Sequence, residues 1–222
     1  MDKLIFEILR KEVLLIGKAK NGILSMFVLM VSLVFIFHYS EEKTSLMDMN
    51  SLLGLKWAIM FMVSFVLIGQ SAWEERESGA LRINQIYLSG SVFFLCKSFV
   101  LFLAISLVAI LEILMFSFFF ESFNLDFKFF FGNIVFFGLG IFSLSLLGVS
   151  LSIVSFATRL KEMVLPLLLI PFSIPILLFG MEAERKFIFQ KGDTVFSAII
   201  MVSLVFLYSA LGLLLQEFSV EN

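Results

Sequence analysis

Residues 92–120 read VFFLCKSFVLFLAISLVAILEILMFSFFF, and Lys97 and Glu112 are the only charged side chains among them. A helix needs about 20 apolar residues, each rising about 1.5 Å, to cross the hydrocarbon core of a bilayer. A strand of a membrane barrel would alternate apolar and polar residues, which the unbroken apolar run from Phe99 to Leu103 contradicts. The stretch therefore predicts a transmembrane helix. We expect the whole chain to be an all-α integral membrane protein.

The composition of the whole chain agrees with this prediction. Of its 222 residues, 60% are hydrophobic and 15% are charged, whereas soluble domains are about 45–50% apolar and about 25% charged. The single cysteine, Cys96, cannot form a disulfide within the chain. No basic surface for nucleic acid is recognisable. We expect residues 1–222 to form one domain that has the lipid bilayer as its surroundings.

Clusters of charged residues divide the chain into six predicted spans. They lie at about 22–39, 52–72, 92–120, 129–157, 163–180 and 194–215. The fifth span is short and contains three prolines, so a re-entrant segment remains an alternative there. Residues 1–21 interleave charged side chains with Leu4, Ile5, Ile8 and Leu9, a pattern that predicts an amphipathic interfacial helix rather than a cleavable signal.

The distribution of lysine and arginine predicts that both termini are cytoplasmic. With the N-terminus inside, ten of the 16 basic residues fall on the inner side and six on the outer side. This count assigns Lys56 to the outer side and takes Lys97 as an anchor at the inner membrane surface.

Two further polar residues lie in or beside the spans. His38, the only histidine, has no second ligand near it in the sequence, so we expect an interfacial residue rather than an axial ligand or proton relay. Glu112 lies about 30 Å along the third span, so we expect its carboxylate to snorkel or contact a helix near the outer boundary.

No motif for catalysis is present. The sequence lacks a phosphate-binding loop, a zinc-protease motif and a serine nucleophile elbow. We therefore predict no catalytic, cofactor-binding or metal site in this chain, and any ATP must be hydrolysed by another subunit.

The fourth span carries a stripe of small residues on one helical face. Its members are Gly138, Ser145, Gly148, Ser152 and Ser155. Small side chains let helix backbones approach closely in lipid. The stripe predicts a packing face, whose partner is either another helix of this chain or a second copy of it.

The segment 73–91 joins charged residues to a short apolar face. It includes Glu75, Arg76, Glu77, Gly79 and Leu81. Together with the N-terminal interfacial helix, it offers a cytoplasmic surface on which a soluble motor could dock.

The fifth span contains Pro166, Pro171 and Pro175. An interior proline removes one backbone hydrogen bond of a helix. Inside a membrane the freed carbonyl groups need other partners. We therefore expect a kinked or broken helix that acts as a hinge.

Three stretches of the chain resemble one known family. They are ERESGAL at 75–81 followed by Lys97, TRLKEMVLP at 158–166 running into LLLIPFSIP up to Pro175, and LRKEV at 9–13. They are similar to heme exporter protein B of cytochrome c maturation, the CcmB family of ABC-type export permeases. In this resemblance residues 75–81 correspond to the first cytoplasmic loop, which couples to the ATPase, and residues 158–175 to the fifth helix. The predicted topology puts Arg159 and Glu162 in the second cytoplasmic loop.

The resemblance implies a permease subunit in a bacterial cytoplasmic (inner) membrane. Its partners would be a separate ATP-binding cassette subunit, a heme-handling membrane protein and a small accessory membrane protein. ATP would act through the partner, heme would be cargo, and no cofactor would be bound tightly by this chain. The resemblance leaves open whether heme passes through this subunit.

Two other classes of function remain. One is an export permease of the same architecture for a lipid, glycan or drug. The other is an ATP-independent assembly factor or secondary transporter, for which internal repeats or paired intramembrane charges are typical. Neither feature is recognisable in the sequence.

Overall fold

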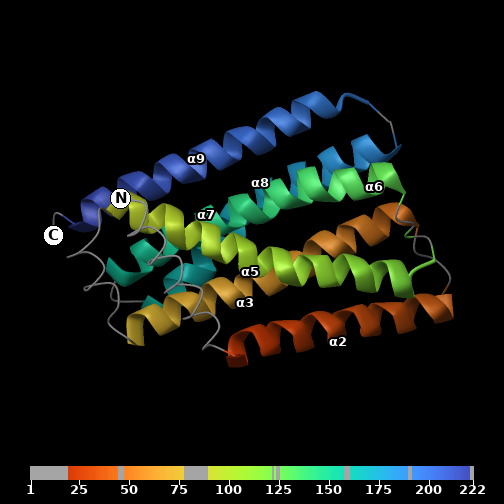
Figure 1. Cartoon of the computed structure of the whole chain (residues 1–222), viewed down its shortest axis with the longest axis horizontal. Coiled ribbons are helices and arrows are strands. Elements are labelled where there is room, and N and C mark those ends of the chain that lie inside the picture. Colours follow the sequence, from red (N-terminus) through yellow and green to blue (C-terminus); the bar gives the residue numbers. More distant parts are fainter. Residues whose placement is uncertain are drawn as a thin grey trace.

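A computed structural model describes residues 20–44, 48–77, 90–121, 123, 126–157, 161–189 and 192–220. The described residues form helices and no strand. In chain order the helices are α2 (Lys20–Thr44), α3 (Met49–Glu77), α5 (Gly90–Phe119), α6 (Phe127–Gly132), the π-helix η1 (Asn133–Phe137), α7 (Gly138–Ala157), α8 (Lys161–Phe189) and α9 (Thr194–Val220). They lie side by side along the long axis of the molecule (Figure 1).

The helices follow the predicted spans in order, although α8 continues well past the predicted end of the fifth span. Among the described residues, five helical segments are long and apolar enough to cross a membrane, and α2 contains a shorter apolar segment, Leu24–Ser40. Residues 127–155, which run through α6, η1 and α7, form one of the five. This confirms an all-helical, multi-span membrane protein. The predicted interfacial helix falls on residues 1–21, of which 1–19 lie outside the described part of the chain.

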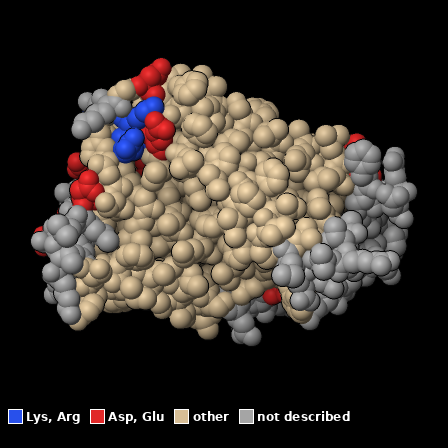
Figure 2. Space-filling view, turned by 180° about the vertical axis from the view of Figure 1, so that it is seen from behind, with Lys and Arg blue, Asp and Glu red and all other residues tan. Residues whose placement is uncertain are grey.

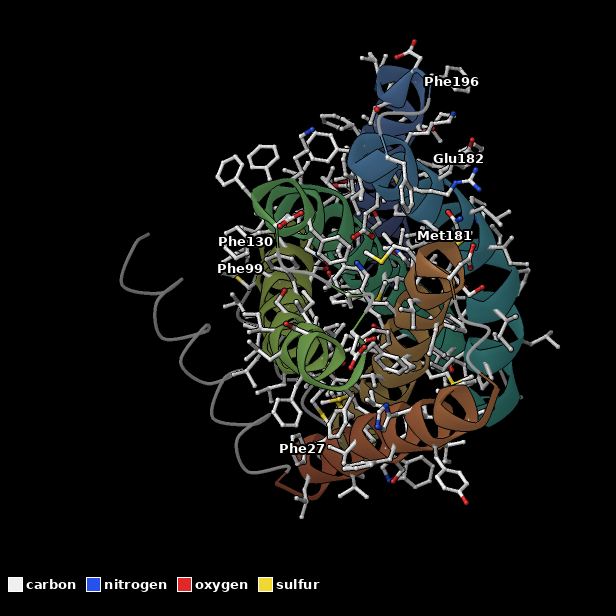
Figure 3. The ribbon with its side chains drawn as sticks, turned by 90° about the vertical axis from the view of Figure 1, so that its right-hand side faces the viewer. Phe27, Phe99, Phe130, Met181, Glu182 and Phe196 are labelled. Carbon is white, nitrogen blue, oxygen red and sulfur yellow. The ribbon has the colours of Figure 1, made fainter. Side chains whose placement is uncertain are left out.

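The surface has the character expected of a protein in lipid. Figure 2 shows a broad middle zone of uncharged side chains on the face it draws, with acidic and basic residues gathered towards one end and a few acidic residues towards the other. Large apolar side chains are exposed along the helices. Phe27, Phe99, Phe130 and Phe196, which are 40–63% exposed, point away from the bundle in the end-on view of Figure 3.

Helix α7 is the centre of the bundle. It packs against α3, α5, α8 and α9, whereas α2 packs against α3 and α5. The small-residue stripe explains this position, because Ser145, Gly148 and Ser152 are all buried inside the chain. A Cβ atom on Gly148 would lie 2.6 Å from Cδ1 of Ile68 on α3. The packing partner of this part of the stripe is therefore another helix of the same chain.

Serine hydroxyl groups are accommodated in this apolar centre by their own helix. Ser143 and Ser150 donate to the carbonyl groups of Leu139 and Leu146 at 2.9 and 2.8 Å. Ser145 and Ser152 donate in the same way to carbonyl groups three residues earlier. A serine that bonds its own helix can occupy a tight helix contact without leaving a donor unsatisfied.

Helix α8 corrects part of the prediction for the fifth span. It is one continuous helix of 29 residues that contains all three prolines. The expectations of a broken helix and of a re-entrant segment were therefore wrong. Tyr208 of α9 donates its hydroxyl to the carbonyl group of Phe172 at 2.7 Å. This carbonyl is not one that a proline frees, because those lie four residues earlier, at Leu167 for Pro171 and at Pro171 for Pro175. The expectation that neighbouring helices supply partners for the freed carbonyl groups stays a prediction.

The C-terminal ends of α2, α5 and α8 and the N-terminal ends of α3, α6 and α9 all lie at one end of the bundle, called here the connector end (Figure 1). The three helices that begin there each follow an aspartate. Asp48 accepts the backbone N–H of Ser51 at 3.0 Å, and Asp193 accepts that of Val195 at 2.9 Å. Both are N-caps. Hydrogen bonds from the side chains of Ser51 and Asn50 lower the pKa of Asp48.

We predict that Gly148→Ala destabilises the protein by about 1–3 kcal/mol, because the added methyl group overpacks the contact with Ile68. Gly138→Ala is the matched control in the same stripe, since a Cβ there meets nothing within 4 Å. It should leave stability unchanged or raise it by up to about 1 kcal/mol through helix propensity. Thermal unfolding of the two purified variants in detergent compares them. Equal melting temperatures would contradict the close packing of Gly148.

Candidate functional site

Five polar or amphipathic side chains from four parts of the fold meet inside the bundle towards the connector end. We call them the buried charge cluster. They are Lys56 and Trp57 of α3, Glu112 of α5, Asn133 of η1 and Glu184 of α8, and none is more than 5% exposed. Charged side chains inside a membrane protein are costly and mark functional sites more often than structural ones.

Lys56 is the centre of this cluster. Its ammonium group is 0% exposed, forms an ion pair with Glu184, and donates to Oδ1 of Asn133 at 2.6 Å. Its Nζ also lies 4.2 Å from the centre of the Phe137 ring. An ammonium group has three donors, so a carboxylate, an amide and an aromatic face account for all of them.

Trp57 binds the second carboxylate oxygen of Glu184, the one that Lys56 does not bind. Its indole N–H donates to Oε2 of Glu184 at 2.6 Å. The indole ring fits where α7 and α8 carry glycines, because a Cβ on Gly140 or Gly180 would lie 2.5 or 2.3 Å from ring atoms. Close approach of the two helices to the ring therefore fixes the direction of the indole N–H.

The π-helix places Asn133 against Lys56. A π-helical turn is rare and occurs most often at functional sites. The amide N–H of the Asn133 side chain donates to the carbonyl group of Phe129 at 2.8 Å. This bond orients the amide, so that Oδ1 faces Lys56.

The side chain of Glu112 does not lie where the sequence predicted it. It does not snorkel at a membrane boundary but is 1% exposed, and it interacts electrostatically with Lys56 and Glu184. Its Oε1 atom is buried and has no hydrogen-bond partner. Distance along the helix was the wrong criterion, because α5 turns this side chain towards α3 and α8 instead of towards lipid.

A second ion pair joins Glu75 of α3 to Lys97 of α5. Glu75 is 9% and Lys97 3% exposed, and Nζ of Lys97 lies 5.9 Å from the centre of the Phe93 ring. The prediction that Lys97 is an anchor at the membrane surface was wrong. Glu75 lies in the last turn of α3 and not in a loop, because α3 extends to Glu77.

The other predicted loop residues are only partly described. Arg76 and Glu77 end α3, and Glu162 lies in the first turn of α8, all at the end of the bundle opposite the connector end. Gly79, Leu81 and Arg159 lie outside the described residues. His38 packs its ring 5.1 Å from Phe119 and 5.8 Å from Phe120, and its Nδ1 atom is buried. Where the chain is described, no group of three side chains could hold a metal ion.

Of the buried charge cluster, only Glu112 was singled out from the sequence. Lys56 was assigned to the outer side, although this lysine lies inside the predicted span 52–72. The fifth span was predicted to end at residue 180, which put Glu184 in a loop, whereas α8 continues to Phe189. The available signal was the lysine itself, because a lysine within an apolar span requires a partner inside the protein. The statement that paired intramembrane charges are missing was wrong.

The sequence model of the family described as CcmB protein matches residues 3–220, nearly the whole chain. No curated protein sequence matches it.

We predict that Lys56→Met destabilises the protein by about 3–5 kcal/mol, because it leaves the carboxylate of Glu184 buried without its cation. The double variant Lys56→Met/Glu184→Gln should recover part of this loss, since neither charge then remains. A double-mutant cycle from unfolding in detergent measures the coupling.

Glu182→Gln is the control, since it lies two residues from Glu184. Its ion pair with Lys186, at 2.9 Å, is partly exposed, with side chains 39% and 23% accessible, and should contribute less than about 1 kcal/mol. Equal effects of Lys56→Met and Glu182→Gln would contradict the special cost of the buried pair.

Proposed function

Because the chain belongs to the CcmB protein family, we propose that it is the membrane-spanning permease subunit of an ABC-type exporter in the maturation of c-type cytochromes. The observation that carries this proposal is the family match over residues 3–220. Five long apolar helices and one shorter apolar helix support it, as they suit a membrane-spanning subunit. In this proposal ATP is hydrolysed by a separate ATP-binding cassette subunit, and heme is the cargo of the complex.

We place the protein in a bacterial inner membrane with both termini in the cytoplasm. The connector end then faces outward, and the buried charge cluster lies in the outer part of the bundle. The end of α3 and the start of α8 face the cytoplasm, where the ATP-binding subunit docks. The heme-handling membrane protein and the small accessory protein of the maturation complex are further proposed partners.

One observation favours a second candidate function. The ion pair of Lys56 and Glu184 inside the bundle is typical of secondary transporters that move ions or protons without ATP. The two candidates differ in the partner that they require. Only the permease needs an ATP-binding subunit.

We predict that the tagged full chain co-purifies from membranes with an ATP-binding cassette protein encoded beside the cytochrome maturation genes. Deletion of the gene should abolish covalent heme attachment to c-type cytochromes, measured by heme staining of denatured membrane proteins. Wild-type chain restores staining. Recovery without any ATP-binding protein would favour the second candidate, and normal staining in the deletion strain would favour export of a lipid, glycan or drug.

A charge variant tests the docking site within the same experiment. Glu77→Lys should lower recovery of the ATP-binding subunit while the chain remains in the membrane. Glu75 needs a different design, because it already pairs with Lys97. The exchange Glu75→Lys/Lys97→Glu keeps an ion pair, so it should restore any recovery that Glu75→Lys loses through misfolding. If Glu77→Lys leaves recovery unchanged, Glu77 has no part in docking.

We predict that Pro171→Ala/Pro175→Ala lowers heme attachment while expression and recovery of the ATP-binding subunit persist. Alanine returns two backbone donors to α8, which should stabilise one straight form of the helix and oppose the change of shape needed in transport. The matched control is Pro166→Ala, one turn into the helix. Full heme attachment in the double variant would show that the two prolines serve packing alone.

A further inference from the structure

The buried charge cluster contains one more acidic group than its cation can compensate. Lys56 is committed to Glu184, Asn133 and the face of Phe137. Glu184 receives hydrogen bonds from Lys56 and Trp57 on its two oxygens. Glu112 remains, 1% exposed, with Oε1 buried and unpartnered. If it were ionised, it would be an uncompensated anion in an apolar interior, which costs many times the energy of a hydrogen bond.

No other described group supplies the missing positive charge. The titratable groups that interact with Glu112 are Lys56 of α3 and Glu184 of α8. Helix α7 carries no titratable side chain. His38 of α2 contacts Phe119 and Phe120, about two turns further along α5. In α9, Tyr208 donates to Phe172, and Glu217 is exposed near the opposite end of the bundle.

We propose that Glu112 is a proton-binding site, which holds one proton while the helices are packed as in this structure. One proton makes the cluster neutral, with Lys56 positive and Glu184 negative. A metal cation fits less well, because the ammonium group of Lys56 would repel it and the described residues contain no metal-ligand group of three. This inference does not rest on the proposed function.

The site links proton binding to the arrangement of α3, α5 and α8. Two carboxylates compete for one ammonium group, so a shift of α3 towards α5 can exchange the partner of Lys56. Glu112 then loses its proton and Glu184 gains one. This exchange transfers the proton within the cluster, so the cluster keeps the same number of protons. A motion that admits water at the connector end releases the proton to water instead, since water stabilises the carboxylate. Movement of these helices is therefore accompanied by proton transfer within the cluster or by proton release.

We test the proposal by infrared spectroscopy of the purified full chain in detergent. At neutral pH the wild-type protein should show the C=O stretch of a protonated carboxylic acid, which shifts in D₂O. Glu112→Gln should lose this band. Glu121→Gln, which changes an exposed carboxylate in the link after α5, should keep it. Absence of the band from the wild-type protein overturns the proposal, and so does its loss in Glu184→Gln instead of Glu112→Gln.

A second variant covers the case in which Glu112→Gln fails to fold. Glu112→Asp keeps a carboxyl group in a changed environment, so its band should shift in frequency. An unshifted band would assign the proton elsewhere. Thermal unfolding against pH gives an independent readout. Because the folded state binds more protons than the unfolded state, the melting temperature of the wild-type protein should fall as pH rises through neutrality. Glu112→Gln should remove this fall, and an unchanged slope would contradict the proposal.

Discussion

The ion pair between Lys56 and Glu184 is the constraint on which the packing of the helices near the connector end depends. Neither side chain can reach water, so each requires the other, and the requirement joins α3 to α8. Lys56 also donates a hydrogen bond to Asn133, and Glu184 accepts one from Trp57. Asn133 brings the π-helix η1 into the same contact. Glycines on α7 and α8 make room for the indole ring. A buried pair of this kind adds little net stability compared with apolar side chains, but it excludes most other alignments of these helices.

The two ion pairs lie at different depths along α3. Glu75 and Lys97 tie α3 to α5 near the end where α3 stops, and Lys56 and Glu184 tie it to α8 near the end where it begins. Helix α3 thus connects a polar contact at each end through a buried apolar face packed on α7. In the proposed permease, this helix is a direct physical link between the proposed docking end and the buried charge cluster.

Features that depend on local interactions could be predicted from the sequence, whereas features that depend on contacts between distant helices could not. Six spans could be placed because apolar transfer energy adds up locally, residue by residue, over about 20 positions. The stripe with Gly148 predicted a packing face correctly, since helical periodicity is also local. The expectation of a broken fifth span was wrong, since α8 is one continuous helix that contains three prolines, and the hinge stays a prediction. Contacts with other helices, such as the hydrogen bond from Tyr208 of α9 to Phe172, are not visible in a local pattern.

Hydropathy along the sequence therefore determined that this is a helical membrane protein and the order of its long apolar segments, and three sequence motifs indicated the family that it resembles. Only the tertiary structure decided which charges meet. Lys56 and Glu184 are 128 residues apart, and Lys56 and Asn133 are 77 apart. In the sequence Lys56 was counted on the outer side, Glu184 fell in a predicted loop, and Glu112 was expected near the membrane boundary. The rotation and register of four packed helices turn these residues towards each other. That geometry arises from side-chain packing over the whole bundle, and no single span contains it.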